Sequence, residues 1–147
     1  MKLQDTVTIQ APLEATWAFL TDANQVAMCA PGVEGVEELE PLKKYKVMAA
    51  VGFGNMKVKF DTGLEFVELD HPSFAKIKAH GKAPGSAVDA IASMTLTEKG
   101  DNETELAWEA DINVMGTIAA LANRMMGSVT KTMTTQFFDC VKARLEE

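Results

Sequence analysis

The apolar residues of this chain change their spacing once, and that change limits the folds that the chain can adopt. Between Tyr45 and Val114 they recur at every second position, in runs separated by turn-forming residues, after an acidic segment from Val33 to Leu39 that is interpreted as an edge strand. Such alternation predicts half-buried strands of an antiparallel sheet. After Gly116 the spacing becomes three and four residues up to Leu145, which predicts one long amphipathic helix. A sheet with one apolar face and a helix with one apolar stripe can bury both surfaces when the helix lies across the sheet.

The first part of the chain adds a strand and two short helices. Polar and apolar residues alternate up to Ile9, and a proline soon afterwards ends that strand. A short helix is expected over residues 13–20, and Asp22 is placed to cap a second helix that ends near Cys29. The predicted fold class is therefore α+β, with a strand, two short helices, about six further strands and a long helix. A single domain over residues 1–147 accounts for this order.

The inner face of the predicted sheet is rich in alanine, and the facing helix carries methionine and phenylalanine. Small side chains on a curved sheet leave volume unfilled, and methionine adapts to varied shapes, so one interpretation is an apolar ligand pocket closed by the helix. The other interpretation is a core in which the large helix side chains fill every gap. The residues that would line the pocket are Val47, Ala49, Phe60, Phe66, Ala92, Met94, Trp108, Ala110, Met125, Met126, Val129, Met133 and Phe137.

The sequence offers few groups for catalysis or metal binding. It holds no recognised nucleophile or phosphate-binding motif, and His71 and His80 fall in a turn and at an outward strand position. The two cysteines, Cys29 and Cys140, are 111 positions apart and form no CxxC motif. We therefore expect no disulfide framework and no cysteine zinc site. The prediction is a protein without catalytic residues, metal or cofactor.

The chain carries a net charge of −7, but the charge is unevenly spread. The negative total argues against nucleic acid as a partner, because phosphates require a basic surface. Residues 43–82 differ from the rest, since eight lysines and four acidic residues give them a net charge of +4. Six of these lysines have outward parity on three predicted strands: Lys44, Lys46, Lys57, Lys59, Lys76 and Lys78. The face that they share is either a solvated surface or a docking surface for an acidic partner or anionic lipid.

The sequence also bears on where the protein resides. No apolar run approaches the roughly 18 residues of a transmembrane helix. The first residues lack the apolar segment of a signal peptide. We therefore expect a cytoplasmic protein whose cysteines are reduced.

Several short motifs occur in a characteristic order along the chain. They are Thr16-Trp17-Ala18-Phe19-Leu20, Ala30-Pro31-Gly32-Val33-Glu34, Lys57-Val58-Lys59-Phe60, Ser86-Ala87 and Thr135-Gln136-Phe137-Phe138. With the order of elements, these motifs resemble the family of the carbon monoxide dehydrogenase G subunit, within the wider Bet v 1/START-like superfamily. The resemblance spans nearly all of the chain, and the Pro-Gly-Val-Glu segment is its most specific part.

The resemblance implies a helix-grip fold, in which a seven-stranded antiparallel sheet wraps around the C-terminal helix and leaves a cavity between them. It also implies an accessory, non-enzymatic role beside molybdenum hydroxylases of the carbon monoxide dehydrogenase type, through membrane attachment or the handling of an isoprenoid quinone. Some family members carry a C-terminal extension that reaches the membrane. Because this chain ends at Glu147, we expect only transient contact with the inner face of the cytoplasmic membrane.

Three functions remain open from the sequence. The first is a binding protein for an apolar molecule, such as a quinone, that serves a redox enzyme. The second is an enzyme, because the superfamily that the chain resembles includes cyclases and hydratases. An enzyme would need polar residues inside the cavity, and the inner face offers only Thr62 and Tyr45. The third is an assembly factor with a closed core and no ligand.

Overall fold

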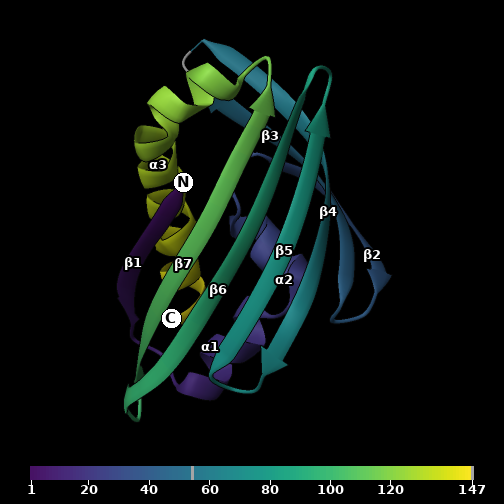
Figure 1. Cartoon of the computed structure of the whole chain (residues 1–147). Helices are drawn as coiled ribbons and strands as arrows, with labels where there is room; N and C mark the ends of the chain where they lie inside the picture. Colours follow the sequence, from purple (N-terminus) through teal and green to yellow (C-terminus); the bar gives the residue numbers. More distant parts are fainter. Residues whose placement is uncertain (54, 147) are drawn as a thin grey trace.

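The computed structural model describes residues 1–53 and 55–146. Figure 1 shows one curved sheet with the helices on one side of it. All strand pairs are antiparallel, in the order β1-β7-β6-β5-β4-β3-β2. The strands are β1 Lys2–Ile9, β2 Val33–Glu40, β3 Lys44–Phe53, β4 Met56–Asp70, β5 Phe74–Ala83, β6 Ser86–Gly100 and β7 Glu103–Gly116. The helices are α1 Leu13–Leu20, α2 Ala23–Cys29 and α3 Ala119–Leu145.

This architecture confirms the predicted α+β fold. A strand, two short helices, six consecutive strands and a long helix follow one another in the expected order. The hairpin connections make β2 to β7 sheet neighbours in sequence order, while β1 joins the sheet beside β7. The sheet thus has the seven strands that the helix-grip fold requires.

The sequence around α2 explains where this short helix starts and how the chain leaves it. The Asp22 carboxylate accepts hydrogen bonds from the backbone N–H groups of Asn24 (3.1 Å) and Gln25 (3.4 Å), which otherwise have no partner at a helix start. After α2 the chain turns through Gly32, whose φ is +82°. The Ala50 backbone N–H donates to the Gly32 carbonyl at 2.8 Å, which fixes the loop to β3.

The hydrophobic core has two parts, one under each half of α3. The N-terminal half packs on β3 and β4, in a cluster of Phe53, Phe60, Ile118, Ala122 and Met126. The C-terminal half packs against α1, α2 and the opposite end of the sheet, in a cluster of Ile9, Ala11, Trp17, Phe19, Cys29, Ala75, Leu96, Leu106 and Val141. None of the described helices is both long enough and apolar enough to cross a membrane.

Candidate functional site

An apolar cavity of about 310 Å³ lies between the sheet, α2 and the C-terminal half of α3. Phe66, Ile77 and Ala92 are cross-strand neighbours on β4, β5 and β6, so their side chains share the concave face. Val26 of α2 and Phe137 of α3 line the cavity from the helix side. The remaining lining residues are Leu20, Ala23, Ala27, Ala30, Val33, Val36, Tyr45, Val47, Leu64, Ala75, Ser93, Met94, Leu106, Trp108 and Phe138.

Small side chains explain why space remains at this place. Ala75 and Ala92 lie on β5 and β6, and α2 contributes Ala23 and Ala27. Protein interiors normally pack as densely as organic crystals, so alanines on facing walls leave a void unless a larger neighbour fills it. The resulting volume lies at the lower end of the roughly 300–1,000 Å³ found for small-molecule sites. The structure therefore contains the apolar pocket rather than a fully packed core.

Tyr45, the single tyrosine of the chain, places a phenol on this apolar wall. The residue is 3% exposed, and its ring meets Phe66 edge-on with the centroids 6.1 Å apart. The Leu42 backbone N–H donates to Tyr45 Oη at 3.0 Å. The hydroxyl accepts this bond from the turn between β2 and β3 and keeps one proton that it can donate. Within the described chain, no carboxylate, histidine or amine lines the cavity.

Part of the predicted ligand site lies on the cavity wall. Met94 and Trp108 are cross-strand neighbours on β6 and β7, as strand parity required. The helix contributes Phe137, one of the two phenylalanines of its Phe-Phe pair. The predicted residues that line the cavity are Val47, Phe66, Ala92, Met94, Trp108 and Phe137.

The other predicted site residues lie outside the lining of this cavity. One group packs in the cluster under the N-terminal half of α3, where large side chains fill the space: Phe60, Met125, Met126 and Val129. Met133 faces a shallow groove beside β3 instead. Ala49 and Ala110 are half-buried but do not line the cavity. Both halves of α3 carry methionine, so helical spacing alone could not tell which half borders the empty space.

The contribution of α2 and β2 to the cavity was missed from the sequence. Ala23, Val26 and Ala27 line the cavity from α2, and their i, i+3, i+4 spacing is a pattern that could have identified an inward helix face. Val33 and Val36 line it from β2. A register shift after Val33 breaks the alternation of β2, so these valines share a face although they are three positions apart.

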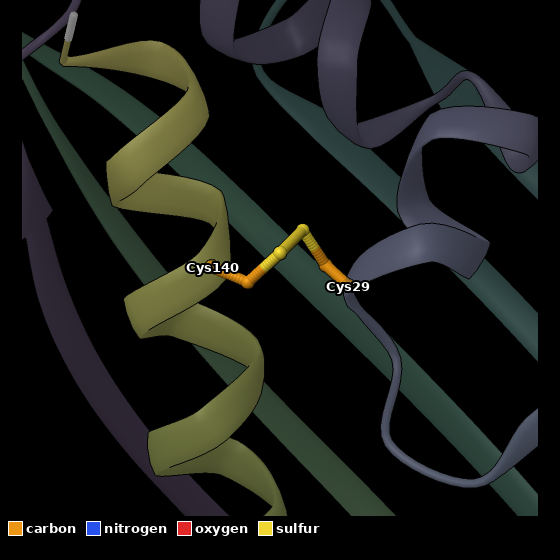
Figure 2. The surroundings of a disulfide bond; sticks show 2 residues. All are labelled: Cys29 and Cys140. Atoms are coloured by element: carbon orange, nitrogen blue, oxygen red, sulfur yellow. A yellow bond between two sulfur atoms is a disulfide. The ribbon is translucent and has the colours of Figure 1, made fainter.

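Cys29 and Cys140 form a disulfide bond, which contradicts the expectation of two unconnected, reduced cysteines (Figure 2). Their Cα atoms lie 5.4 Å apart. The bond joins the last residue of α2 to the C-terminal half of α3. Their separation of 111 residues misled the prediction, because α2 folds back against α3 and brings the two cysteines together.

The six outward lysines lie on the adjacent strands β3, β4 and β5, but acidic residues alternate with them. Three ion pairs have Nζ–oxygen distances of 3.6–4.0 Å: Lys44 with Glu65, Lys46 with Asp61 and Lys59 with Glu34. The strand register also places Lys76 opposite Glu68 and Lys78 opposite Glu65. The basic segment is thus interleaved with carboxylates, and its role as a docking surface stays a prediction.

Neither histidine lies at the cavity. His80 contacts Asp89 on the outer face of the sheet. His71 Nε2 lies 2.9 Å from a Glu14 carboxylate oxygen, and its ring meets Trp17 edge-on with the centroids 5.6 Å apart. His71 therefore joins the turn between β4 and β5 to α1. The described residues contain no cluster of three or more side chains that could hold a metal ion.

Residues 6–146 match the family described as the G subunit of carbon monoxide dehydrogenase (CoxG). The chain belongs to this family. A conserved protein from Geobacillus kaustophilus has a similar structure, with 25% sequence identity and a TM-score of 0.91 over 99% of this chain and 95% of that chain. No curated protein matches the sequence of this CoxG-family chain significantly.

More distant structures show that the CoxG-family chain has a START-like helix-grip fold. The Zhui aromatase/cyclase from Streptomyces sp. R1128 is 18% identical, with a TM-score of 0.77 over 99% of this chain and 93% of that chain. A START superfamily protein from Mycobacterium smegmatis is 12% identical, with a TM-score of 0.71 over 99% and 97% of the two chains. At these identities the similarity concerns the fold.

Proposed function

We propose that this CoxG-family protein binds an apolar small molecule and acts as an accessory protein to a molybdenum hydroxylase of the carbon monoxide dehydrogenase type. The observation that carries the proposal is the cavity of about 310 Å³, walled by aliphatic and aromatic side chains. Membership of a family described as a subunit of carbon monoxide dehydrogenase supports the link to that enzyme.

The chemistry of the wall limits the class of ligand. An apolar body suits the aliphatic and aromatic lining, and we propose that one hydrogen-bond acceptor of the ligand pairs with the Tyr45 hydroxyl. A ring that bears a carbonyl, as in an isoprenoid quinone, meets both requirements. Because the cavity is small for a ligand site, it would hold the ring and the first part of a tail, and a longer tail would extend beyond it.

Binding suits this wall better than catalysis does. Structures of the same fold include proteins named as enzymes, such as the Zhui aromatase/cyclase and norcoclaurine synthase from Thalictrum flavum. General acid–base catalysis relies mostly on histidine, carboxylate and lysine side chains. The ionisable group on the described wall of this cavity is the Tyr45 phenol. The proposal is therefore a carrier or binding protein, and its link to a redox enzyme rests on the family.

A native mass spectrum of protein purified without detergent tests the proposal. We expect a population heavier than the 15.9 kDa chain, with the extra mass released on denaturation and recovered in organic solvent. The Ala92→Trp variant, purified in the same way, should lack that mass because the indole occupies the cavity. A bare chain that also takes up no added naphthoquinone would contradict the proposal.

A quinone and its hydrocarbon analogue test the role of Tyr45. The ligand 2-methyl-1,4-naphthoquinone carries carbonyl acceptors that 2-methylnaphthalene lacks. Tyr45→Phe should weaken quinone binding about two- to tenfold, which corresponds to the loss of one neutral hydrogen bond. The affinity for the hydrocarbon should not change, as measured by calorimetric titration. An equal loss for both ligands would indicate altered packing and would argue against a hydrogen bond from Tyr45.

A further inference from the structure

A covalent bond joins two walls of the cavity. Figure 2 shows the disulfide between Cys29, at the end of α2, and Cys140 on α3. Ala30, next to Cys29, lines the cavity, and so does Phe137, one helical turn before Cys140. The disulfide therefore fixes the distance between α2 and α3 at the edge of the proposed ligand site.

Without this bond, α2 has little to hold it in place. The helix has seven residues, and helices of this length are unstable on their own. Its inward side chains, Ala23, Val26 and Ala27, are small and bury little apolar surface. On its outer side, Met28 is 60% exposed.

The chain is anchored on both sides of α2. Before it, the Thr21 backbone N–H donates to the Trp17 carbonyl at 3.0 Å, which closes the last turn of α1. After it, the Gly32 carbonyl accepts a hydrogen bond from the Ala50 N–H at 2.8 Å. Residues 22–31 lie between these anchors. A displacement of this segment would therefore leave the anchored chain on either side in position.

We propose that Cys29 and Cys140 form a site of reversible thiol–disulfide exchange that controls access to the cavity, an inference that rests on the proposed ligand-binding function. A dithiol reductant attacks one sulfur and breaks the S–S bond. The two cysteines take up two electrons and two protons and become thiols, while the reductant becomes a disulfide. In the oxidised protein the bond holds α2 in place as a wall of the cavity, and in the reduced protein α2 moves away and the ligand exchanges faster.

A reductant can reach the bond from the Cys140 side. Cys140 lines a surface groove between α1, α2 and the end of α3, together with Gln25 and Arg144. In the reduced protein the nearby cation favours the Cys140 thiolate, which is the form that attacks when the disulfide forms again. Cys29, in contrast, is 5% exposed. The more accessible side of the bond is therefore the one at Cys140, which is half-buried and borders this groove.

Binding kinetics of N-phenyl-1-naphthylamine, a neutral apolar fluorophore, test the inference. Stopped-flow fluorescence should show association and dissociation about tenfold faster after reduction with dithiothreitol, which corresponds to a barrier about 1.4 kcal/mol lower. The double variant Cys29→Ser/Cys140→Ser should show the fast rates with and without reductant. Reoxidation of the wild-type protein should restore the slow rates, and circular dichroism should show the same fold in both forms.

Each other outcome overturns the inference in a distinguishable way. Equal rates in the two forms, with binding intact, would exclude control by the disulfide and leave the ligand-binding function standing. Failure of both forms to bind the fluorophore would contradict the ligand-binding function and the inference together. Loss of the folded circular dichroism signal on reduction would show that the bond stabilises the whole fold and does not act on α2 alone. Two free thiols in the air-oxidised protein would also contradict it.

Discussion

Gly32 shows how one residue fixes the geometry on which the cavity depends. Its φ of +82° lies in the left-handed region that glycine adopts without strain. A Cβ atom at this position would lie 2.1 Å from the Ala50 carbonyl oxygen. The absent side chain therefore allows the loop after α2 to approach β3 closely enough for the hydrogen bond from Ala50.

Substitution of Gly32 should be costly, and another glycine nearby provides a control. Gly32→Ala should lower the free energy of unfolding by about 1–3 kcal/mol, because both the positive φ and the contact with backbone atoms oppose a Cβ. Gly35 on β2 has no atom within 4 Å of its Cβ position, so Gly35→Ala should change stability little. Urea unfolding measures both variants. Equal effects would show that the close approach at Gly32 has no energetic role.

Asp22, at the start of α2, makes a contribution to the free energy of unfolding that depends on pH. The Gln25 side-chain amide, 3.0 Å from Asp22 Oδ2, is the main cause that lowers the pKa of this carboxyl below 3.8. Desolvation, the next largest effect, opposes it by raising the pKa, and the backbone N–H groups of Gln25 and Asn24 lower the pKa further. A lowered folded pKa stabilises the protein above the unfolded pKa, and this stabilisation is lost as the pH falls through the folded pKa.

The Asp22→Ala variant should therefore differ from the wild type mainly above pH 4. At pH 7 we expect a loss of about 1 kcal/mol in the free energy of unfolding, typical of a lost helix cap. The difference should shrink as the pH falls below about 4, where the carboxylate becomes protonated. Asp22→Asn keeps a capping oxygen without the charge, so its stability relative to Asp22→Ala should not depend on pH. Thermal unfolding across pH 2–7 measures the difference in stability between the wild type and Asp22→Ala. A difference that stays the same at every pH would contradict this explanation.

At the scale of elements, the sequence predicted which segments form strands and helices, but not where the cavity lies among them. Alternation places Phe66, Ala92 and Trp108 on the concave face, and the structure confirms this because parity is a local property of a strand. Whether Met126 packs in the core or lines a void depends on the residues that face it across the fold. These residues, Phe53 and Phe60, are distant in the sequence. Contacts between residues distant in the sequence also bring Cys29 and Cys140 together, which is why the disulfide was not predicted.

The two halves of α3 should respond differently to truncation. Met126 is 6% exposed within the cluster under the N-terminal half, so Met126→Ala should cost about 2–5 kcal/mol of unfolding free energy. Its effect on apolar-ligand affinity should be small, because Met126 does not line the cavity. Met133 lies at a surface groove, and Met133→Ala serves as the milder control on the same helix. A large loss of affinity in folded Met126→Ala would place the ligand under the other half of α3.

At the scale of the whole molecule, charge that is segregated along the sequence becomes mixed in the fold. The acidic first 42 residues include β2, which lies beside β3 and brings Glu34 within 3.6 Å of Lys59. On β4, the Glu65 and Asp61 carboxylates form ion pairs with Lys44 and Lys46. Exposed pairs of this kind contribute little to stability, but they reduce the net positive field of the outer face.

Reversal of four lysines to glutamate tests whether that face still docks to an acidic partner or an anionic membrane. The variant Lys57→Glu/Lys59→Glu/Lys76→Glu/Lys78→Glu should keep apolar-ligand binding and lose most sedimentation with anionic vesicles at low salt. Salt should weaken the wild-type interaction, because charges are screened beyond about 8 Å at physiological ionic strength. Neutral vesicles serve as the control. If the wild-type protein does not bind anionic vesicles or the partner enzyme at low salt, the lysine face is only a solvated surface.

The space between α2, α3 and the sheet is expected to bind an apolar molecule. Titration with N-phenyl-1-naphthylamine tests this expectation on three proteins: wild type, Ala92→Trp and Ile91→Trp. Ala92 faces the cavity, whereas its neighbour Ile91 points to the other face of the sheet and is 46% exposed. We predict saturable binding by wild type and Ile91→Trp, and no binding by Ala92→Trp, which should remain folded because the indole enters empty volume. Equal binding by all three proteins, or none by the wild type, would contradict the account.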